Sequence, residues 1–334
     1  MKDGFIRVAA ATPDIHVADP QYNSEQIIEL MEQGSTRGVK VMAFPELCLT
    51  AYTCSDLFLQ ESLLREAKKE LKRILQASKS KDMIIFVGMP WMHKGKLYNV
   101  AAVLNRGRIL GIVPKKHLPN YSEFYELRHF NPGMEKVEMT DWEGVQVPMG
   151  MNLLFACRTM PELVLAAELC EDVWVPCPPS ISHALAGATV IANCSASDET
   201  TGKDQYRYNL ICGQSARLVC GYIYANAGEG ESSQDLVFGG QNIIAENGTC
   251  LVQSDRFKNA CICADLDLGR IISERRRMTT FRDEENRSAS YETVYFELNT
   301  EDSAKKDSKK AGQKRDELLR YIDPAPFVPH DAGQ

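Results

Sequence analysis

PELVLAAELCEDVWVPCPP, residues 161–179, contains the strand and the turn around which this chain is built. Its apolar run, residues 163–167, has the length and composition of a β-strand that is buried on both faces. The run leads to Cys170, which three carboxylates flank: Glu168, Glu171 and Asp172. A thiol at the end of such a strand can be held rigidly and still face a cleft. Cys170 is therefore a candidate nucleophile, although free cysteine is also a common small core residue.

A nucleophilic Cys170 would need help from other parts of the chain. A thiol with its ordinary pKa of about 8.5 is mostly protonated at neutral pH, and nearby carboxylates raise that pKa further. A base must take the proton, and a cation must offset the anion. A strand at residues 41–46 ends in Glu46, and an apolar stretch at residues 112–119 carries Lys115 and Lys116. Sequence spacing alone does not bring these groups to Cys170.

Three segments carry a family resemblance: FPELCLTAY (44–52), VPKKHLPNYSEFYE (113–126) and ELCEDVWVP (168–176). In this order they resemble the nitrilase superfamily of carbon–nitrogen hydrolases. They are most similar to the glutamine-hydrolysing domains of glutamine-dependent NAD synthetases. NCSASDETTGKDQYR (193–207) and ERRRMTTFR (274–282) extend the resemblance over nearly the whole chain. The resemblance implies a nitrilase-like α/β fold, a four-layer αββα sandwich.

The resemblance also implies roles for individual residues. Glu46 would be the general base, Lys115 the cation and Cys170 the nucleophile. Lys115 is chosen over Lys116 because the family lysine lies three residues before the leucine of the Leu-Pro pair, here Leu118. Attack on the glutamine side-chain amide would release ammonia and leave a γ-glutamyl thioester, which water would hydrolyse. The backbone N–H of Glu171 would help Lys115 to stabilise the oxyanion.

Further positions match the family's supporting and substrate-binding residues. Glu126 corresponds to a second glutamate that supports the lysine. A free amino acid needs a carboxylate for its ammonium group, which suits Glu171. Lys203 falls where some relatives carry arginine, and simple exposure to solvent is the alternative. The resemblance places five residues in the glutamine pocket: Tyr121, Phe124, Glu171, Ser197 and Lys203.

Other interpretations of these residues stay open at this point. Glu46 could cap a helix or pair with a surface cation, and Lys115 could be an exposed turn residue. His117 could pair with Cys170 in a cysteine–histidine dyad. Two other functions remain for the whole chain. It could be a free-standing nitrilase-superfamily amidase that acts on another small amide, or a non-catalytic subunit that keeps the fold.

Composition narrows the possible partners and the compartment. The chain has 334 residues, of which 44% are hydrophobic and 25% charged, and a net charge of −7. Such a charge argues against nucleic acid as a partner. No long apolar run or signal-peptide pattern occurs, so we expect a cytoplasmic protein without a membrane partner. The eleven cysteines are expected to be reduced, and because no CxxC pair occurs we expect no metal site.

Strands and helices alternate along the chain. Gln26 completes a capping-box pattern with Asn23, which we expect to start a helix. Asn247-Gly248 suits a hairpin turn, and residues 119–150 are expected to form a long, loop-rich wall of a binding site. We expect strands at residues 5–12, 39–44, 83–89, 97–104, 109–113, 163–167, 188–194, 222–225 and 260–265, and helices at 63–78, 180–185, 206–219 and 268–276.

The domain organisation is expected to be simple. Residues 1–298 should form one nitrilase-like domain, and the charged segment 299–334 should be a linker toward an NAD synthetase domain that this chain lacks. ATP and deamido-NAD would belong to that domain, whereas glutamine hydrolysis needs no cofactor. Relatives assemble, so a homo-oligomer is expected. The cluster Arg275–Arg277 could contact phosphate, or be a solvated or subunit-interface cluster.

Overall fold

Two β-sheets form the centre of the molecule in the computed structural model, which describes residues 4–299, 318–325 and 328. The eight-stranded first sheet has the order β14 (Cys261–Asp267), β1 (Phe5–Ala11), β2 (Val41–Ala43), β3 (Ile84–His93), β4 (Lys96–Asn105), β5 (Arg108–Pro114), β7 (Val145–Met149), β6 (Glu138–Trp142). The seven-stranded second sheet has the order β13 (Thr249–Gln253), β12 (Ile243–Glu246), β11 (Gly221–Asn226), β10 (Val190–Ser195), β9 (Val164–Leu169), β8 (Leu153–Cys157), β15 (Glu292–Phe296).

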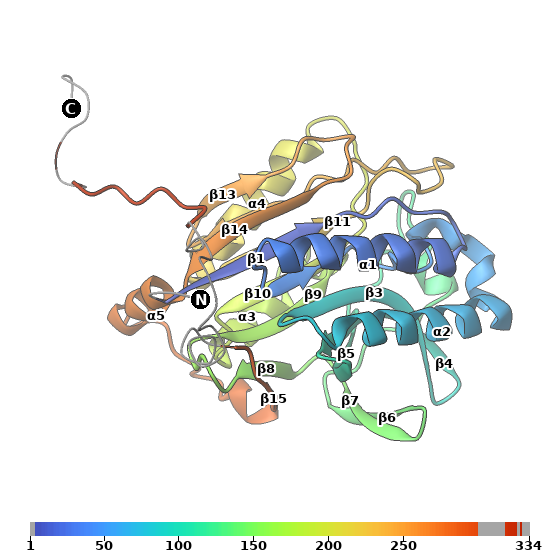
Figure 1. Cartoon of the computed structure of the whole chain (residues 1–334), viewed down its shortest axis with the longest axis horizontal. Coiled ribbons are helices and arrows are strands. Elements are labelled where there is room, and N and C mark those ends of the chain that lie inside the picture. The colour runs from blue at the N-terminus through green and yellow to red at the C-terminus, as the bar shows by residue number, and fades with distance from the viewer. Residues whose placement is uncertain (1–3, 300–317, 326–327, 329–334) are drawn as a thin grey trace, which may run out of the picture.

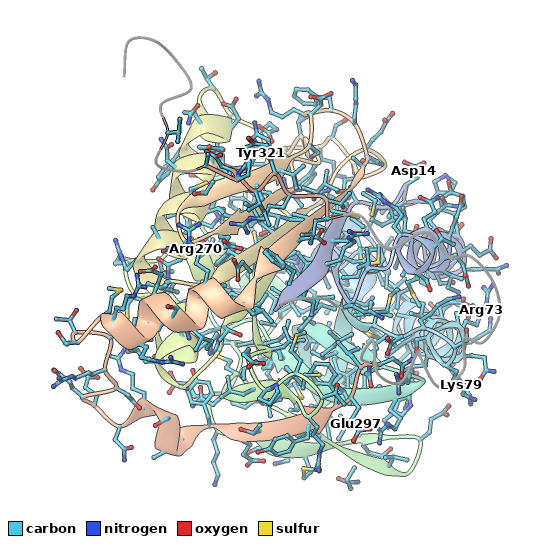
Figure 2. All side chains as sticks on the ribbon, turned by 60° about the vertical axis from the view of Figure 1, so that its left-hand side comes forward. Asp14, Arg73, Lys79, Arg270, Glu297 and Tyr321 are labelled. Carbon is cyan, nitrogen blue, oxygen red and sulfur yellow. The ribbon has the colours of Figure 1, made fainter. Side chains whose placement is uncertain are left out.

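Helices cover the outer face of each sheet. The helices α1 (Pro20–Thr36) and α2 (Glu61–Ser78) lie side by side and pack on the first sheet (Figure 1). The helices α3 (Pro179–Leu185) and α4 (Lys203–Leu218) pack on the second sheet, and α5 (Leu268–Arg277) follows β14. Figure 2 shows Arg270 of α5 and Arg73 of α2 on opposite sides of the molecule. The order helix, sheet, sheet, helix confirms the expected four-layer sandwich.

The largest apolar core lies between the two sheets. It combines inward-facing residues of both, such as Val8 and Val103 from the first sheet and Leu165 and Ile223 from the second. Phe86 and Phe155 meet across the interface edge to face, with ring centroids 6.3 Å apart. A pair of this kind contributes about 0.5–1.5 kcal/mol beyond its buried area. The sandwich therefore fixes the relative positions of strand ends from both sheets, and these strand ends build the site.

One local prediction from the sequence is wrong, and a second one is only partly right. Helix α1 begins at Pro20 with Asp19 as its N-cap, because the Asp19 carboxylate accepts the Tyr22 N–H and proline suits the first helical position. Asn23 lies inside the helix, where its side chain bonds to the His16 backbone. The stretch 119–150, expected to be rich in loops, also contains the hairpin β6–β7. The strands β8 and β15 were not expected from the sequence.

The structure agrees with the turn predicted at Asn247-Gly248, and it gives Arg275 a role that the sequence did not indicate. Asn247 and Gly248 have φ angles of 44° and 86° and join β12 to β13, which confirms the predicted hairpin. Arg275 donates hydrogen bonds to the carbonyl oxygens of Leu218 and Val219 at the C-terminal end of α4, and to that of Ala188, which precedes β10. Its guanidinium group thus satisfies carbonyls that the helix leaves free. Arg275 is therefore neither a phosphate contact nor part of a solvated cluster.

The segment 318–325 lies against the strands β12 and β14. Arg320 donates two hydrogen bonds to the Glu246 carboxylate, at 2.7 and 2.9 Å, and the Leu319 N–H donates to Asp265. Figure 2 labels Tyr321, whose side chain is exposed. Residues 300–317, within the expected linker, lie outside the described residues. Among the helices of the described residues, none is both long and apolar enough to cross a membrane.

Candidate active site

Three strand ends place the candidate catalytic side chains together. Glu46 follows β2, Lys115 directly follows β5, and Cys170 directly follows β9. The first two strands belong to the first sheet and β9 to the second, so the site spans the interface between the sheets. The turn at Glu46 passes very close to β3, since a Cβ atom at Gly88 would lie 2.2 Å from the Pro45 carbonyl oxygen. Glycine at position 88 therefore allows this approach.

Lys115 is held by two carboxylates in the interior. Its Nζ atom lies 2.6 Å from Oε1 of Glu46 and 2.6 Å from Oε1 of Glu126. The side chains of Lys115 and Glu46 have no exposed surface, and that of Glu126 is 4% exposed. Burial lowers the pKa of Lys115, but the charges of Glu126 and Glu46 outweigh it, so the pKa lies well above its ordinary value. Lys115 is therefore a permanent cation.

Neighbouring donors fix both carboxylates. Glu46 accepts the Asn99 side-chain amide at 2.6 Å and the Ala196 backbone N–H at 3.1 Å. Glu126 accepts the Tyr52 hydroxyl at 2.7 Å, while its Oε2 atom has no partner among the described residues. Burial, which Lys115 partly offsets, raises the pKa of Glu126 to about 7. The set is thus rigid around Glu46 and can change protonation at Glu126 near neutral pH.

Cys170 sits at a sharp turn between β9 and a short 3-10 helix, Cys170–Val173. Its φ angle is 40°, a left-handed conformation that costs energy for a residue with a Cβ atom. The side chain is 5% exposed. Burial and the charge of Glu46 raise the pKa of the Cys170 thiol well above its ordinary value, while Lys115 acts in the opposite direction. The resting residue is therefore a thiol that needs a base.

A cavity of about 350 Å³ opens onto Cys170. All five residues that the sequence assigned to the substrate pocket line it, together with Trp174, Tyr206 and the turn 200–202. Glu171 accepts a hydrogen bond from the Tyr121 hydroxyl at 2.9 Å, and burial raises the pKa of its carboxyl group. The cavity thus offers a thiol at one point of its wall and a carboxylate beside it.

Lys203 supplies the cation of this cavity. Its ammonium group forms an ion pair with Asp198 and lies over the rings of Phe124 and Trp174, 5.7 and 5.5 Å from their centroids. Lys203 starts helix α4 at the cavity wall. The alternative that this lysine is simply exposed is therefore wrong.

Sequence reasoning gave no role to two buried residues near the site. Arg207 is fully buried and donates to the Ser197 hydroxyl, the Asp198 carbonyl and the Glu199 carboxylate, so it fixes the segment beside the cavity. Asp172 accepts the backbone N–H groups of His117 at 2.9 Å and Leu169 at 3.1 Å. Both side chains lie in the quoted motifs, but only the fold shows what they contact.

The remaining alternatives from the sequence can be compared with this geometry. His117 does not line the cavity that contains Cys170, and no hydrogen bond joins the two among the described residues. Lys116 pairs with Glu135 at 2.6 Å on the surface. Glu46 and Lys115 are fully buried, which excludes a surface ion pair and an exposed turn. The structure thus brings Glu46, Lys115, Glu126 and Cys170 to one site and leaves His117 and Lys116 outside it.

Comparison with known proteins places the chain among enzymes. Residues 7–276 match the family model described as carbon-nitrogen hydrolase. A glutamine-dependent NAD(+) synthetase from Mycobacterium tuberculosis is 40% identical in an alignment of 334 positions, which covers 98% of this chain and 48% of the relative. Its counterpart from Aquifex aeolicus is 31% identical over 279 residues, covering 83% of this chain and 45% of the relative. The chain thus spans about half the length of the curated relatives it matches.

Solved structures agree with these matches. The crystal structure of a glutamine-dependent NAD(+) synthetase from Cytophaga hutchinsonii has a TM-score of 0.71 at 29% identity and covers 78% of this chain and 43% of its own. An amidase from Nesterenkonia sp. has a TM-score of 0.62 at 20% identity and covers 82% of this chain and 97% of its own. The similarity to the amidase shows that this chain and the amidase have the same fold.

Proposed function

The chain belongs to the carbon–nitrogen hydrolase family, and on this basis we propose that it hydrolyses the side-chain amide of L-glutamine through a thioester at Cys170. The observation that carries the proposal is the cavity that joins the Cys170 turn to Glu171 and Lys203. A carboxylate and an ammonium group in one cavity are complementary to the two charged groups of a free amino acid. The similarity to glutamine-dependent NAD(+) synthetases supports glutamine as that amino acid.

Glu46 is the proposed general base. As the Cys170 sulfur attacks the amide carbon, Glu46 takes the thiol proton and then gives it to the departing nitrogen, so that ammonia leaves. Glu46 is suited to this exchange because three donors hold its two oxygens. In the second half of the reaction Glu46 takes a proton from water, which attacks the thioester and releases glutamate. The cysteine regains its proton at the end, so the cycle needs no cofactor.

Lys115 is the proposed electrostatic partner. Its charge offsets the developing thiolate and, with the backbone N–H of Glu171, stabilises the oxyanion of each tetrahedral intermediate. Glu126 supports it by accepting one of its hydrogen bonds. Because the cation is already held in a dry interior, no reorganisation is needed when charge develops. Tyr121, Phe124 and Ser197 line the same cavity and are proposed to surround the glutamine chain.

The wider context follows from the relatives. We propose that the released ammonia serves NAD synthesis, with ATP and deamido-NAD bound by a synthetase domain that lies outside this chain. Residues 1–298 then form the glutaminase domain, and residues 299–334 form its connector. A homo-oligomer and a cytoplasmic location belong to the same proposal. Size-exclusion chromatography with light scattering and cell fractionation test these two points.

Release of ammonia and glutamate from glutamine by the purified chain tests the proposed function. Asparagine and simple aliphatic amides are measured beside it, with Cys170→Ala as the control. We expect release from glutamine that disappears in the variant. Faster hydrolysis of another amide would contradict the proposed substrate and favour a free-standing amidase. A correctly folded chain that hydrolyses none of them would favour a non-catalytic subunit.

A further inference from the structure

Behind Cys170 lies a connected set of buried polar side chains that the catalytic assignment does not use. Glu168 on β9, Asn193 on β10 and Tyr222 on β11 lie on three neighbouring strands, and Asn193 stands directly opposite Glu168 in the strand register. Each of the three side chains is at most 1% exposed. Buried polar groups of this kind are costly unless all of them are paired. Their mutual pairing therefore fixes their orientations.

The donors and acceptors permit one order of hydrogen bonds. An ionised Glu168 only accepts, and it takes the Ser180 backbone N–H at 2.8 Å and the Tyr222 hydroxyl proton. The hydroxyl has no second proton, so its oxygen accepts the side-chain amide of Asn193 at 3.1 Å. This bond directs the amide nitrogen of Asn193 toward Tyr222, so the carbonyl oxygen, Oδ1, points away from Tyr222. The orientation of the asparagine amide thus depends on Tyr222 and on Glu168, with which the Asn193 side chain also interacts.

The far end of the chain of hydrogen bonds reaches the nucleophile. Oδ1 of Asn193 accepts the backbone N–H of Cys170 at 3.2 Å and the Ser195 hydroxyl at 2.7 Å. The Cys170 N–H is therefore engaged by a side chain that does not line the cavity. The next N–H, that of Glu171, lies in the first turn of the short 3-10 helix, where backbone donors lack an intrahelical acceptor.

We propose that Glu168, Tyr222 and Asn193 act as a positioning relay for the thioester chemistry. The relay keeps Cys170 in its left-handed conformation, holds the Cys170 N–H away from the substrate and leaves the Glu171 N–H as the backbone donor to the oxyanion. The inference rests on the proposed function, because it assigns the relay to that reaction. Neither Asn193 nor Tyr222 lines the cavity, so we assign them as positioning residues and not as catalytic ones.

Tyr222→Phe and Asn193→Leu test the relay. Tyr222→Phe removes only the hydroxyl, and Asn193→Leu keeps the side-chain size while removing the acceptor. We expect kcat for glutamine to fall by about tenfold to a hundredfold, since small displacements of reacting groups have effects of this order. KM should stay within about twofold, because the contacts that bind substrate and transition state equally well are unchanged. Tyr291→Phe is the matched control, since the hydroxyl of the partly buried Tyr291 bonds to His183 at 2.7 Å; it should keep kcat.

Alkylation of Cys170 by iodoacetamide gives a second readout that does not depend on glutamine turnover. A turn released from its hydrogen bond no longer holds the thiol beside Glu46 and Lys115, so we expect the alkylation rate to fall at least about threefold in both relay variants and to stay unchanged in Tyr291→Phe. If wild-type chain released no ammonia from glutamine, the proposed function would fail, while the alkylation rates would still decide on the relay. Relay variants that match Tyr291→Phe in kcat, alkylation rate and Tm would overturn it.

Discussion

The ammonium nitrogen of Lys115 lies 2.6 Å from Oε1 of Glu46, and both side chains are fully buried. Glu126 contacts the same ammonium group, so the ionised cluster has one more negative than positive charge. This excess, together with burial, raises the pKa of the Cys170 thiol. A preformed thiolate is therefore disfavoured at rest. The proton must move to Glu46 as the sulfur attacks, which makes Glu46 the group on which the reaction depends.

Glu46→Gln should abolish most of the activity and leave the fold intact. Glutamine has nearly the same size and can still accept from Lys115, but it cannot take a proton. Loss of a positioned general base costs about 10²- to 10⁴-fold in rate. Steady-state kinetics with glutamine measure the loss. Glu70→Gln is the control, because Glu70 is also a buried, ion-paired glutamate but lies on α2. A Glu46→Gln chain within tenfold of wild type would contradict the assigned role.

Lys115→Met should destabilise the fold as well as the reaction. The substitution leaves Glu46 and Glu126 as buried carboxylates without their cation, and breaking such a group costs about 3–5 kcal/mol. Adding Glu126→Gln removes one of the two charges, so the double variant should regain part of the free energy of unfolding but none of the activity. Urea unfolding of the wild type, the single variant and the double variant at one pH measures both changes in the free energy of unfolding. No recovery in the double variant would mean that the two charges are not coupled through Lys115.

Activity should rise with pH as Glu126 ionises. The pKa of this carboxyl group is raised to about 7, mainly by burial, so the group gains its charge only as the pH passes through that value. An ionised Glu126 holds Lys115, and kcat/KM for glutamine should therefore increase across this range. Glu126→Gln should lose the rise. Asp172 is a necessary control because burial also raises its pKa to about 7; a rise that disappears in Asp172→Asn instead would assign it to that residue.

The raised pKa of Glu126 also makes the free energy of unfolding depend on pH. Between the ordinary value of 4.5 and about 7, the folded chain binds more protons at Glu126 than the unfolded chain does. The contribution of this group to the free energy of unfolding therefore falls as the pH rises through that window. Denaturation at a series of pH values in wild type and Glu126→Gln measures it. A difference between the two that does not change with pH would contradict the raised pKa.

Glu171→Gln should weaken the binding of free glutamine in particular. The substitution removes the carboxylate proposed to bind the ammonium group, and a charged hydrogen bond contributes about 1.5–3 kcal/mol, which corresponds to roughly ten- to a hundredfold in kcat/KM. Simple amides without an ammonium group should lose much less. Tyr121→Phe, which removes only the hydroxyl that bonds to Glu171, should have a smaller effect. Equal losses for glutamine and simple amides would place the ammonium group elsewhere.

Much of this architecture could be predicted from the chain because the signals are local. The buried strand before Cys170, the hairpin at Asn247-Gly248 and the amphipathic α2 follow from apolar periodicity and turn chemistry. The strands β8 and β15 were overlooked because each has only five residues and because β15 pairs with β8, which lies far from it in the sequence. Asn23 has the pattern of an N-cap, but Asp19 before Pro20 starts the helix earlier.

Some residues of the candidate site could likewise be predicted from the sequence, and others could not. Glu46, Lys115 and Cys170 could be named from motifs, but their meeting point depends on how two sheets pack. Asp172 and Asn193 could not be found by residue type, because their roles depend on backbone N–H groups supplied by distant segments. Arg207 looked like an ordinary helix residue until the fold placed it, fully buried, under the segment at Ser197. Contacts of this kind become visible only in three dimensions.

Mapping the adduct of a glutamine-like chloroketone tests the central claim most directly. The purified chain is incubated with the reagent, with and without glutamine, and the modified peptide is identified by mass spectrometry. The chain has eleven cysteines, ten of them other than the proposed nucleophile. We predict one adduct per chain, located on Cys170, slowed by glutamine and absent in Cys170→Ala. An adduct on another cysteine, or labelling of Cys170 that glutamine does not slow, would contradict the assignment of Cys170 as the nucleophile that attacks glutamine.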